Sequence, residues 1–159
     1  MANSIKEVKY SFEDMKQFVA WIGTTLSKQW KIKPESVIGV LNGGAMPALM
    51  VSSYFKIPLY WVRANSYEGR DRKEVKLGYR EYCLQDIKDR HVVVVDEIID
   101  SGSTIKAVYD WLLTLNPKSV MVVSWVVKSG AKLPLIDTVC MTQESKDTWI
   151  IFPWEFSNE

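Results

Sequence analysis

Short apolar runs alternate with stretches of helical spacing along most of the chain. Four β-branched residues at 92–95 predict a strand that is buried on both faces, as central parallel strands are. Apolar residues spaced three and four apart from 105 to 115 predict the helix that follows, with Ser103 or Thr104 as its N-cap. The same order of strand, turn and helix occurs from 37 to 55. The pattern therefore predicts an α/β fold with a parallel sheet.

Further elements are predicted on both sides of these two units. Residues 11–14 have the capping pattern of a helix N-terminus, and the apolar spacing after them predicts a helix that ends near Trp30. Apolar runs predict strands at 59–63, 75–84 and 119–127, and the tail contains short strand-like pieces. His91, the only histidine, precedes the central strand, so we expect it to be structural or exposed.

Composition narrows the class of protein. A chain of 159 residues with 47% hydrophobic and 25% charged residues is typical of one globular domain. A net charge of +1 does not favour a nucleic-acid binder, and no run approaches the length of a membrane span. The N-terminal residues lack the apolar core of a signal peptide, so we expect a cytoplasmic protein without a membrane partner. Cys83 and Cys140 lack metal-ligand spacing, and reduced thiols are favoured over a disulfide.

Three carboxylates and a hydroxyl-rich turn follow the predicted central strand. Ligands of open α/β sheets bind beyond the carboxyl ends of the strands. A turn that opens a helix also offers N–H groups and hydroxyls to a phosphate. An ordinary βα junction is the simpler alternative, but helix capping needs only one carboxylate. The candidate residues are Asp96, Glu97, Asp100, Ser101, Gly102, Ser103 and Thr104.

This stretch resembles the phosphoribosyl-pyrophosphate (PRPP) signature of type I phosphoribosyltransferases, in which an apolar strand precedes two acidic residues and a phosphate loop. The resemblance extends from about 37 to 155. It implies a Rossmann-like parallel sheet flanked by helices in one domain, 1–159, with a core at about 10–128. It also implies a catalytic role for Asp100 and PRPP binding by Asp96, Glu97, Ser101, Gly102, Ser103 and Thr104.

The resemblance implies a function for two further segments. A Gly-Gly turn such as that at 42–44 is, without other evidence, more often a tight turn than a ligand-binding loop. The composition of the polar stretch after the strand at 59–63 indicates a solvated hairpin tip. In the family the first segment binds pyrophosphate, and the second is a flexible loop, here about 64–76, that covers the substrate. The implied pyrophosphate-binding residues are Asn42, Gly43, Gly44, Ser66 and Tyr67.

Two positions depart from the usual family pattern. Family members often have an arginine at the position of Asn42, so this chain lacks a charge-assisted contact there. The phosphate loop at 101–104 has a serine where a second glycine is common. Serine adds a hydroxyl donor but narrows the freedom of the backbone. Both changes bear on substrate preference and turnover.

The tail resembles the ending of bacterial xanthine-guanine phosphoribosyltransferases, with an Asp-Thr-Trp-Ile run at 147–150 before Pro-Trp-Glu at 153–155. Without the resemblance, Lys128 would be a solvated charge and Trp149 a core aromatic. The resemblance implies that the base bonds to Lys128, stacks on Trp149 and faces the backbone of Ile150. It places these contacts in a small C-terminal hood at about 129–159.

The implied function is purine salvage. A phosphoribosyltransferase would transfer ribose 5-phosphate from PRPP to guanine, xanthine or hypoxanthine, with Mg²⁺ held by Asp96 and Glu97. The alternatives are a PRPP-binding regulator of nucleotide metabolism, a purely structural domain and an adenine-specific enzyme, which Lys128 argues against. The family and several exposed-looking aromatic residues suggest a homodimer or homotetramer, and the sequence does not rank the three 6-oxopurines.

Overall fold

A six-stranded sheet forms the centre of the molecule, with the strand order β4-β3-β2-β5-β6-β7. The structure is a computed structural model that describes residues 5–68, 73–78, 85–133 and 137–156. All neighbours in this sheet are parallel except β3 and β4. The predicted fold class is confirmed. The strands are β2 (Ser36–Leu41), β3 (Leu59–Glu68), β4 (Lys73–Gly78), β5 (His91–Ile99), β6 (Ser119–Lys128) and β7 (Thr138–Glu144).

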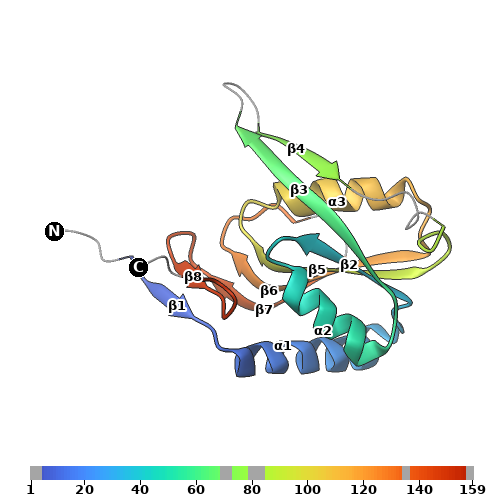
Figure 1. Ribbon diagram of the computed structural model, residues 1–159, viewed down its shortest axis with the longest axis horizontal. Helices are drawn as coiled ribbons and strands as arrows, with labels where there is room; N and C mark the ends of the chain where they lie inside the picture. Colours follow the sequence, from blue (N-terminus) through green and yellow to red (C-terminus); the bar gives the residue numbers. More distant parts are fainter. Residues whose placement is uncertain (1–4, 69–72, 79–84, 134–136, 157–159) are drawn as a thin grey trace.

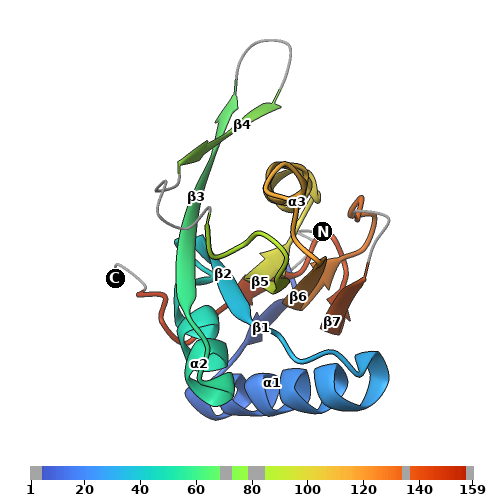
Figure 2. The same cartoon turned by 90° about the vertical axis from the view of Figure 1, so that its right-hand side faces the viewer.

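Helices cover both faces of the sheet, as Figures 1 and 2 show. One face carries α1 (Phe12–Thr25), its π-helical continuation η1 (Leu26–Trp30) and α2 (Ala45–Phe55), whereas the other carries α3 (Ser103–Leu113). Residues at 93 and 95 in β5 pack with the first group and residues at 92 and 94 pack with α3. An uninterrupted run of valines fits this strand because both of its faces are buried.

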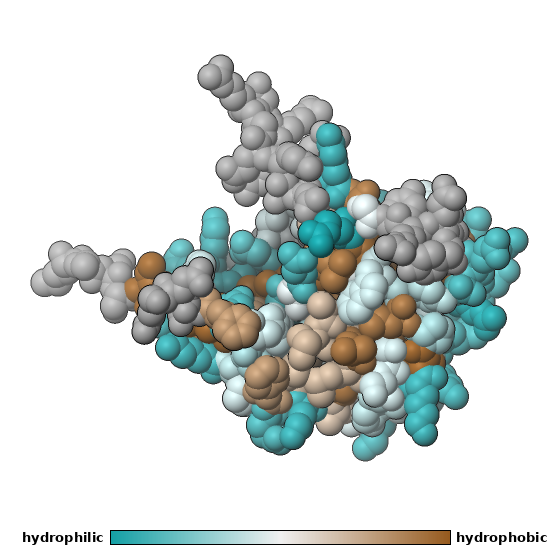
Figure 3. Space-filling view, in the orientation of Figure 1, coloured by the Kyte–Doolittle hydropathy of each residue, from teal (hydrophilic) through white to brown (hydrophobic). Residues whose placement is uncertain are grey.

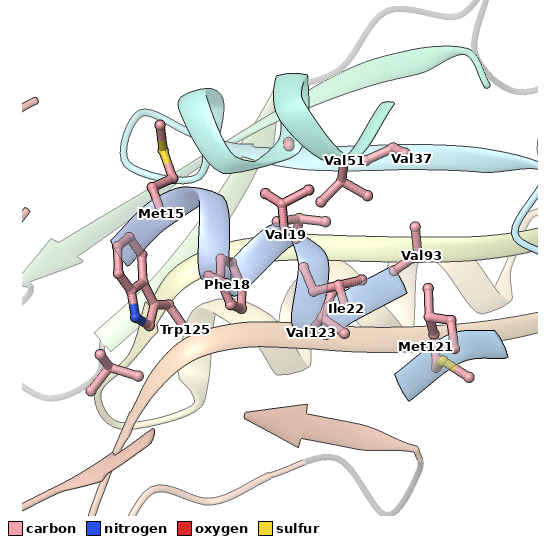
Figure 4. Packing of buried hydrophobic residues seen from close by; sticks show 14 of the residues in the cluster. Met15, Phe18, Val19, Ile22, Val37, Val51, Val93, Met121, Val123 and Trp125 are labelled. Atoms are coloured by element: carbon pink, nitrogen blue, oxygen red, sulfur yellow. The ribbon is translucent and has the colours of Figure 1, made fainter. Parts of the chain in front are cut away.

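The first helix begins as the sequence predicts. Ser11 caps it by accepting the N–H of Asp14, and the Asp14 carboxylate in turn accepts the N–H of Ser11, which completes a capping box. The buried side of the helix packs Phe18 against Trp125 of β6, with their rings stacked 5.4 Å apart (Figure 4). The capping box thus fixes where α1 starts, and the aromatic contact fixes how it lies on the sheet.

A second, two-stranded sheet lies beside the main one. It pairs β1 (Glu7–Lys9) in parallel with β8 (Trp149–Ile151), joining the N-terminal segment to the tail. Phe152 then packs on Trp125 with a ring separation of 5.6 Å, which anchors the tail on the core. The sequence pattern did not predict β1, because three residues with one apolar position show no periodicity.

The predicted loop at 64–76 is mostly a β ribbon. β3 continues to Glu68 and β4 begins at Lys73, and the two strands pair from Arg63 with Gly78 to Glu68 with Lys73. The polar composition concealed these strands because a ribbon that projects from the sheet needs no apolar face (Figure 2). Residues 69–72, and residues 79–84 of the strand predicted at 75–84, lie outside the described part of the chain.

Two smaller expectations can be compared with the structure. His91 is half-buried at the start of β5, and its Nδ1 lies 2.7 Å from Ser119 Oγ, in agreement with a structural role. Cys140 is a free thiol, whereas Cys83 lies outside the described residues. Among the helices that the structure describes, none is long and apolar enough to cross a membrane.

Candidate active site

A hollow of about 230 Å³ opens at the carboxyl edge of the sheet, where β2 and β5 end side by side. Its walls come from two strand–turn–helix units, β2 to α2 and β5 to α3. The lining residues include Asn42, Gly43, Asp96, Glu97, Asp100, Ser101, Gly102 and Thr104. The structure therefore brings together the two turns that sequence reasoning singled out separately.

Asp96 and Glu97 lie within β5, because the strand continues to Ile99 and does not end at residue 95 as predicted. Asp96 is opposite Ser124 of β6 and Ile98 is opposite Val126, so the register of the two strands is the same on both sides of Glu97. The carboxyls of Asp96 and Glu97 are neighbours and interact electrostatically.

Asp96 is a buried carboxylic acid with few compensating contacts. The residue is 7% exposed, and its Oδ1 accepts the backbone N–H of Glu97 at 3.0 Å. Burial raises the pKa of Asp96 well above the usual value of 3.8, and the Glu97 carboxyl raises this pKa further. Oε2 of Glu97 is also buried and lacks a hydrogen-bond partner among the described residues. Two neighbouring acids therefore line the hollow, and one of them, Glu97, has a buried oxygen without a hydrogen-bond partner among the described residues.

The glycines of the turn after β2 allow Glu97 to approach the backbone. A Cβ atom at Gly43 would overlap the Glu97 carboxylate, so only glycine fits at this position while the carboxylate stays in place. A Cβ atom at Gly44 would lie 2.6 Å from the carbonyl oxygen of Val40 and 2.7 Å from that of Val95. The Leu41–Asn42 peptide bond at the start of this turn is cis. Close packing of β2, α2 and β5 thus requires Gly44, whereas Gly43 leaves room for the Glu97 side chain.

The turn after β5 is shaped by another glycine. Gly102 has a φ of 91° and is itself the N-cap of α3, so the predicted capping by Ser103 or Thr104 is wrong. The hydroxyls of Ser101 and Ser103 are 2.9 Å apart and belong to exposed residues, which leaves them accessible to a ligand. A Cβ atom at Gly102 would overlap the carbonyl oxygen of Lys132, whose N–H donates to the Ser101 carbonyl at 2.9 Å.

The residues predicted to bind a base lie at the ends of β6 and β8. Lys128 is 6% exposed, and its Nζ donates to the backbone carbonyls of Ser145, at 3.3 Å, and Thr148. Trp149 is 61% exposed, and it is the one tryptophan of seven, all of them in described segments, that is mostly exposed. Lys128 thus holds the turn that leads directly into Trp149.

The backbone of Ile150 is turned away from β1. The N–H of Trp149 donates to the Lys6 carbonyl at 2.7 Å, and the Ile151 carbonyl accepts the N–H of Tyr10 at 2.9 Å. Backbone groups of successive residues alternate between the two edges of a strand. The N–H and C=O of Ile150 therefore face the free edge of β8.

Several other features complete the region. Ser66 and Tyr67 lie in β3, paired with Val75 and Glu74, and the structure describes their backbone alone. Sequence reasoning missed the contribution of Lys132, and no local signal in the chain could have indicated its contact with Gly102. Among the described residues, no group of three or more His, Cys, Asp or Glu side chains is arranged to hold a metal ion.

Fold and site together define an α/β protein of the kind that binds phosphorylated ligands beyond the carboxyl ends of parallel strands. Residues 2–159 match the family described as phosphoribosyl transferase domain. The chain belongs to this family, and the resemblance seen in the sequence is confirmed.

Individual relatives agree with this assignment. The chain is 31% identical over 124 residues to a xanthine-guanine phosphoribosyltransferase of Cereibacter sphaeroides, covering 77% of this chain and 70% of the relative. It is 27% identical over 146 residues to a hypoxanthine-guanine phosphoribosyltransferase of Streptococcus pneumoniae, with coverage of 89% and 81%. The crystal structure of a Pyrococcus horikoshii purine phosphoribosyltransferase superposes with a TM-score of 0.81 at 25% identity, over 96% of this chain and 97% of that one.

The raised pKa of Asp96 gives a testable dependence of stability on pH. Because the folded state binds the Asp96 proton more tightly than the unfolded state does, ionisation of Asp96 lowers the stability as the pH rises above 3.8. We expect Asp96→Asn to raise the melting temperature of the ligand-free, metal-free protein. The gain is absent at acidic pH, grows as the pH rises, and levels off above the folded-state pKa. Each 1 kcal/mol corresponds to about 2–4 °C in a chain of this size.

Calorimetry between about pH 4 and pH 8 measures this effect. Asp137→Asn is the control, because Asp137 is exposed and lies outside the cavity. A difference between Asp96→Asn and the wild type that does not change with pH would contradict the account of the buried acid.

Proposed function

We propose that the protein is a purine salvage phosphoribosyltransferase. The enzyme transfers ribose 5-phosphate from PRPP to guanine, xanthine or hypoxanthine, releases pyrophosphate and forms the nucleoside 5′-monophosphate. Membership of the phosphoribosyl transferase domain family supports the class of reaction. The names of the relatives, which are hypoxanthine-guanine and xanthine-guanine enzymes, support the choice of base.

The ammonium group of Lys128 is the basis for the proposed preference for a 6-oxopurine over adenine. This group has three N–H donors and no acceptor. The carbonyls of Ser145 and Thr148 take two of these donors, and within the described residues the third has no partner. The exocyclic oxygen of a 6-oxopurine would accept it, whereas adenine presents an amino donor at the same position. Lys128 therefore favours 6-oxopurines over adenine.

Trp149 and Ile150 complete the proposed base site. A large, exposed indole offers a face on which a purine ring stacks, and such stacking contributes about 1–3 kcal/mol per base. The free backbone edge of Ile150 offers one donor and one acceptor to the edge of the purine. The hood at about 129–159 is thus proposed to bind the base.

The turns at the carboxyl edge are proposed to bind the two ends of PRPP. Residues 101–104 would bind the 5′-phosphate through N–H groups at the start of α3 and through the Ser101 and Ser103 hydroxyls. Residues 42–44 would bind the pyrophosphate, with Ser66 and Tyr67 of β3 contributing from the ribbon. The segment at about 64–76 is proposed to cover the substrate, because a ribosyl cation must be shielded from water.

Asp96 and Glu97 fit Mg²⁺. This cation prefers hard oxygen ligands, and it is usually held by one or two carboxylates together with substrate phosphates and waters. The buried, unpartnered Oε2 of Glu97 and the Asp96 carboxyl beside it form such a donor set. When bound, Mg²⁺ would neutralise charge on the pyrophosphate leaving group. The two carboxylates would also accept hydrogen bonds from the ribose hydroxyls.

Asp100 is proposed to act on the attacking base. It is exposed and lines both the hollow beside Asp96 and a second hollow of about 440 Å³ that also includes Ser129 and Lys146. From this position, the carboxylate could accept the proton of the purine ring nitrogen as the new bond to the ribose carbon forms. The same charge could instead stabilise the cationic ribosyl group.

Pyrophosphate release from PRPP and Mg²⁺ tests the proposal directly. We expect turnover with guanine, xanthine or hypoxanthine but not with adenine, and a loss of at least about 100-fold in kcat for Asp100→Ala. Trp149→Ala should raise the KM for the base about tenfold, which corresponds to 1.4 kcal/mol of stacking, and leave the KM for PRPP unchanged. Leu113→Ala removes a similarly exposed apolar side chain on α3 and serves as the control.

The other outcomes distinguish the alternatives. Turnover with adenine alone would overturn the argument from Lys128 and identify an adenine-specific enzyme. PRPP binding without turnover of any base would point to a regulator. A cytoplasmic location and a single-domain organisation stay predictions.

We also propose that the protein forms a homo-oligomer through the outer face of α2. This helix has no charged residue, yet Met46, Leu49 and Tyr54 are exposed on it. Apolar residues gather on the face of the molecule that carries α2 (Figure 3). A helix that is apolar on all sides is normally buried. A second copy of the chain fits best, because a two-fold contact pairs an uncharged apolar face with itself and most soluble oligomers are symmetric homo-oligomers.

Two leucines of similar exposure provide a matched test of this interface. Leu49 on α2 is 52% exposed and Leu113 on α3 is 48% exposed. We expect light scattering to show a dimer or tetramer for the wild type and for Leu113→Glu, and a monomer for Leu49→Glu. A monomeric wild type, or an unchanged mass in Leu49→Glu, would contradict the proposed interface.

A further inference from the structure

The proposed base site depends on the N-terminal segment. Among the described strands, β8 pairs with β1 alone, and the N–H of Trp149 donates to the carbonyl of Lys6 at 2.7 Å. The position of Trp149, whose ring is proposed to stack on the base, therefore depends on residues about 140 positions earlier in the chain. Its placement is set where the N-terminal strand meets the tail.

Lys6 makes a second contact, through its side chain. Its Nζ lies 3.1 Å from Oε2 of Glu144, the last residue of β7. The Glu144 side chain is only 13% exposed, whereas that of Lys6 is 66% exposed. Lys6, which directly precedes β1, thus contacts both Trp149 of β8 and the end of β7.

Glu144 is also the neighbour of Lys128. The two residues are partners in the register of β6 and β7, and the Glu144 carbonyl accepts the N–H of Ser129 at 2.8 Å. Lys128 then donates across the turn at 145–148 to Ser145 and Thr148, which precedes Trp149. The contacts close a ring from Lys6 through Glu144 and Lys128 to Trp149 and back to Lys6.

We propose that Lys6 and Glu144 are positioning residues for the purine base. Their ion pair fixes the turn at 145–148, and through this turn it sets the distance between the Lys128 ammonium and the Trp149 ring. Neither residue touches the base. The inference rests on the proposed function, in which Lys128 and Trp149 bind the base.

The Lys6 end of this ion pair is exposed to solvent, so we expect the pair to contribute little to global stability although Glu144 is largely buried. A positioning role and a structural role therefore predict different results. We expect Glu144→Gln and Lys6→Met each to raise the KM for guanine about three- to tenfold. The KM for PRPP and the melting temperature should stay close to those of the wild type. Lys6→Arg should restore the KM for guanine, because arginine keeps the charge.

The control is an ion pair of similar geometry away from the site. Lys16 and Glu13 on α1 are 3.2 Å apart and exposed. Glu13→Gln and Lys16→Met should leave the KM for both substrates unchanged. The proposal would be overturned if Glu144→Gln changed the KM for guanine and the KM for PRPP equally, or changed neither. A large fall in the melting temperature of Glu144→Gln would also overturn it.

Hydrogen–deuterium exchange separates this proposal from the proposed function, because it needs no turnover. We expect faster exchange at residues 145–151 in Glu144→Gln and Lys6→Met than in the wild type, and no change in Glu13→Gln. Unchanged exchange at 145–151 refutes the positioning role even if the wild type is active. If the two variants exchange faster at 145–151 but the wild type turns over no base, the effect of the ion pair on the turn is supported and the proposed base site is refuted.

Discussion

The two acidic residues near the end of β5 are the constraint on which the rest of the structure depends. Asp96 and Glu97 are neighbouring carboxyls within the strand, and burial keeps them from full solvation. A site that leaves such charges uncompensated costs stability unless a ligand supplies the missing positive charge. The backbone around them is correspondingly tight, because Gly43 leaves room for the Glu97 carboxylate. This cost in stability fits the proposal that Asp96 and Glu97 hold a cation together with the substrate phosphates.

The second half of the site is built differently. The carboxyl edge of the main sheet is shaped by backbone turns, whereas the proposed base site is held by long-range contacts of Lys6, Glu144 and Lys128. Lys132 joins the two halves, since its backbone packs on Gly102 and bonds to Ser101. The hood is therefore in direct contact with the turn proposed to bind the phosphate.

Much of the architecture could be predicted from local pattern. The valines of β5 indicated a strand buried on both faces, and the residues from Ser11 located the start of α1. The strand, turn and helix predicted from 37 to 55 correspond to β2 and α2. The candidate residues around the hollow could be chosen because acids, hydroxyls and glycines followed two strands in a recognisable order. These features depend on neighbours within a few positions, which a sequence shows directly.

The features that escaped prediction depend on distant partners. β1 is a strand because β8, about 140 residues away, supplies its hydrogen bonds, and β5 extends through Asp96 and Glu97 because β6 continues beside it. Polar residues at 64–68 and 73–76 concealed the ribbon, since antiparallel pairing satisfies their backbone without an apolar face. Gly102 replaced the expected Ser103 or Thr104 cap because the carbonyl of Lys132 packs against it. Tertiary contacts override local propensity in each case.

The most direct test of the central claim is calorimetric titration of the protein with PRPP, with and without Mg²⁺, in the wild type and in a Glu97→Gln variant. The account predicts binding that depends on Mg²⁺ in the wild type and is weakened at least about tenfold by Glu97→Gln, because the carboxylate would hold the cation together with the substrate phosphates. PRPP binding of equal strength without Mg²⁺, or unchanged in Glu97→Gln, would contradict it.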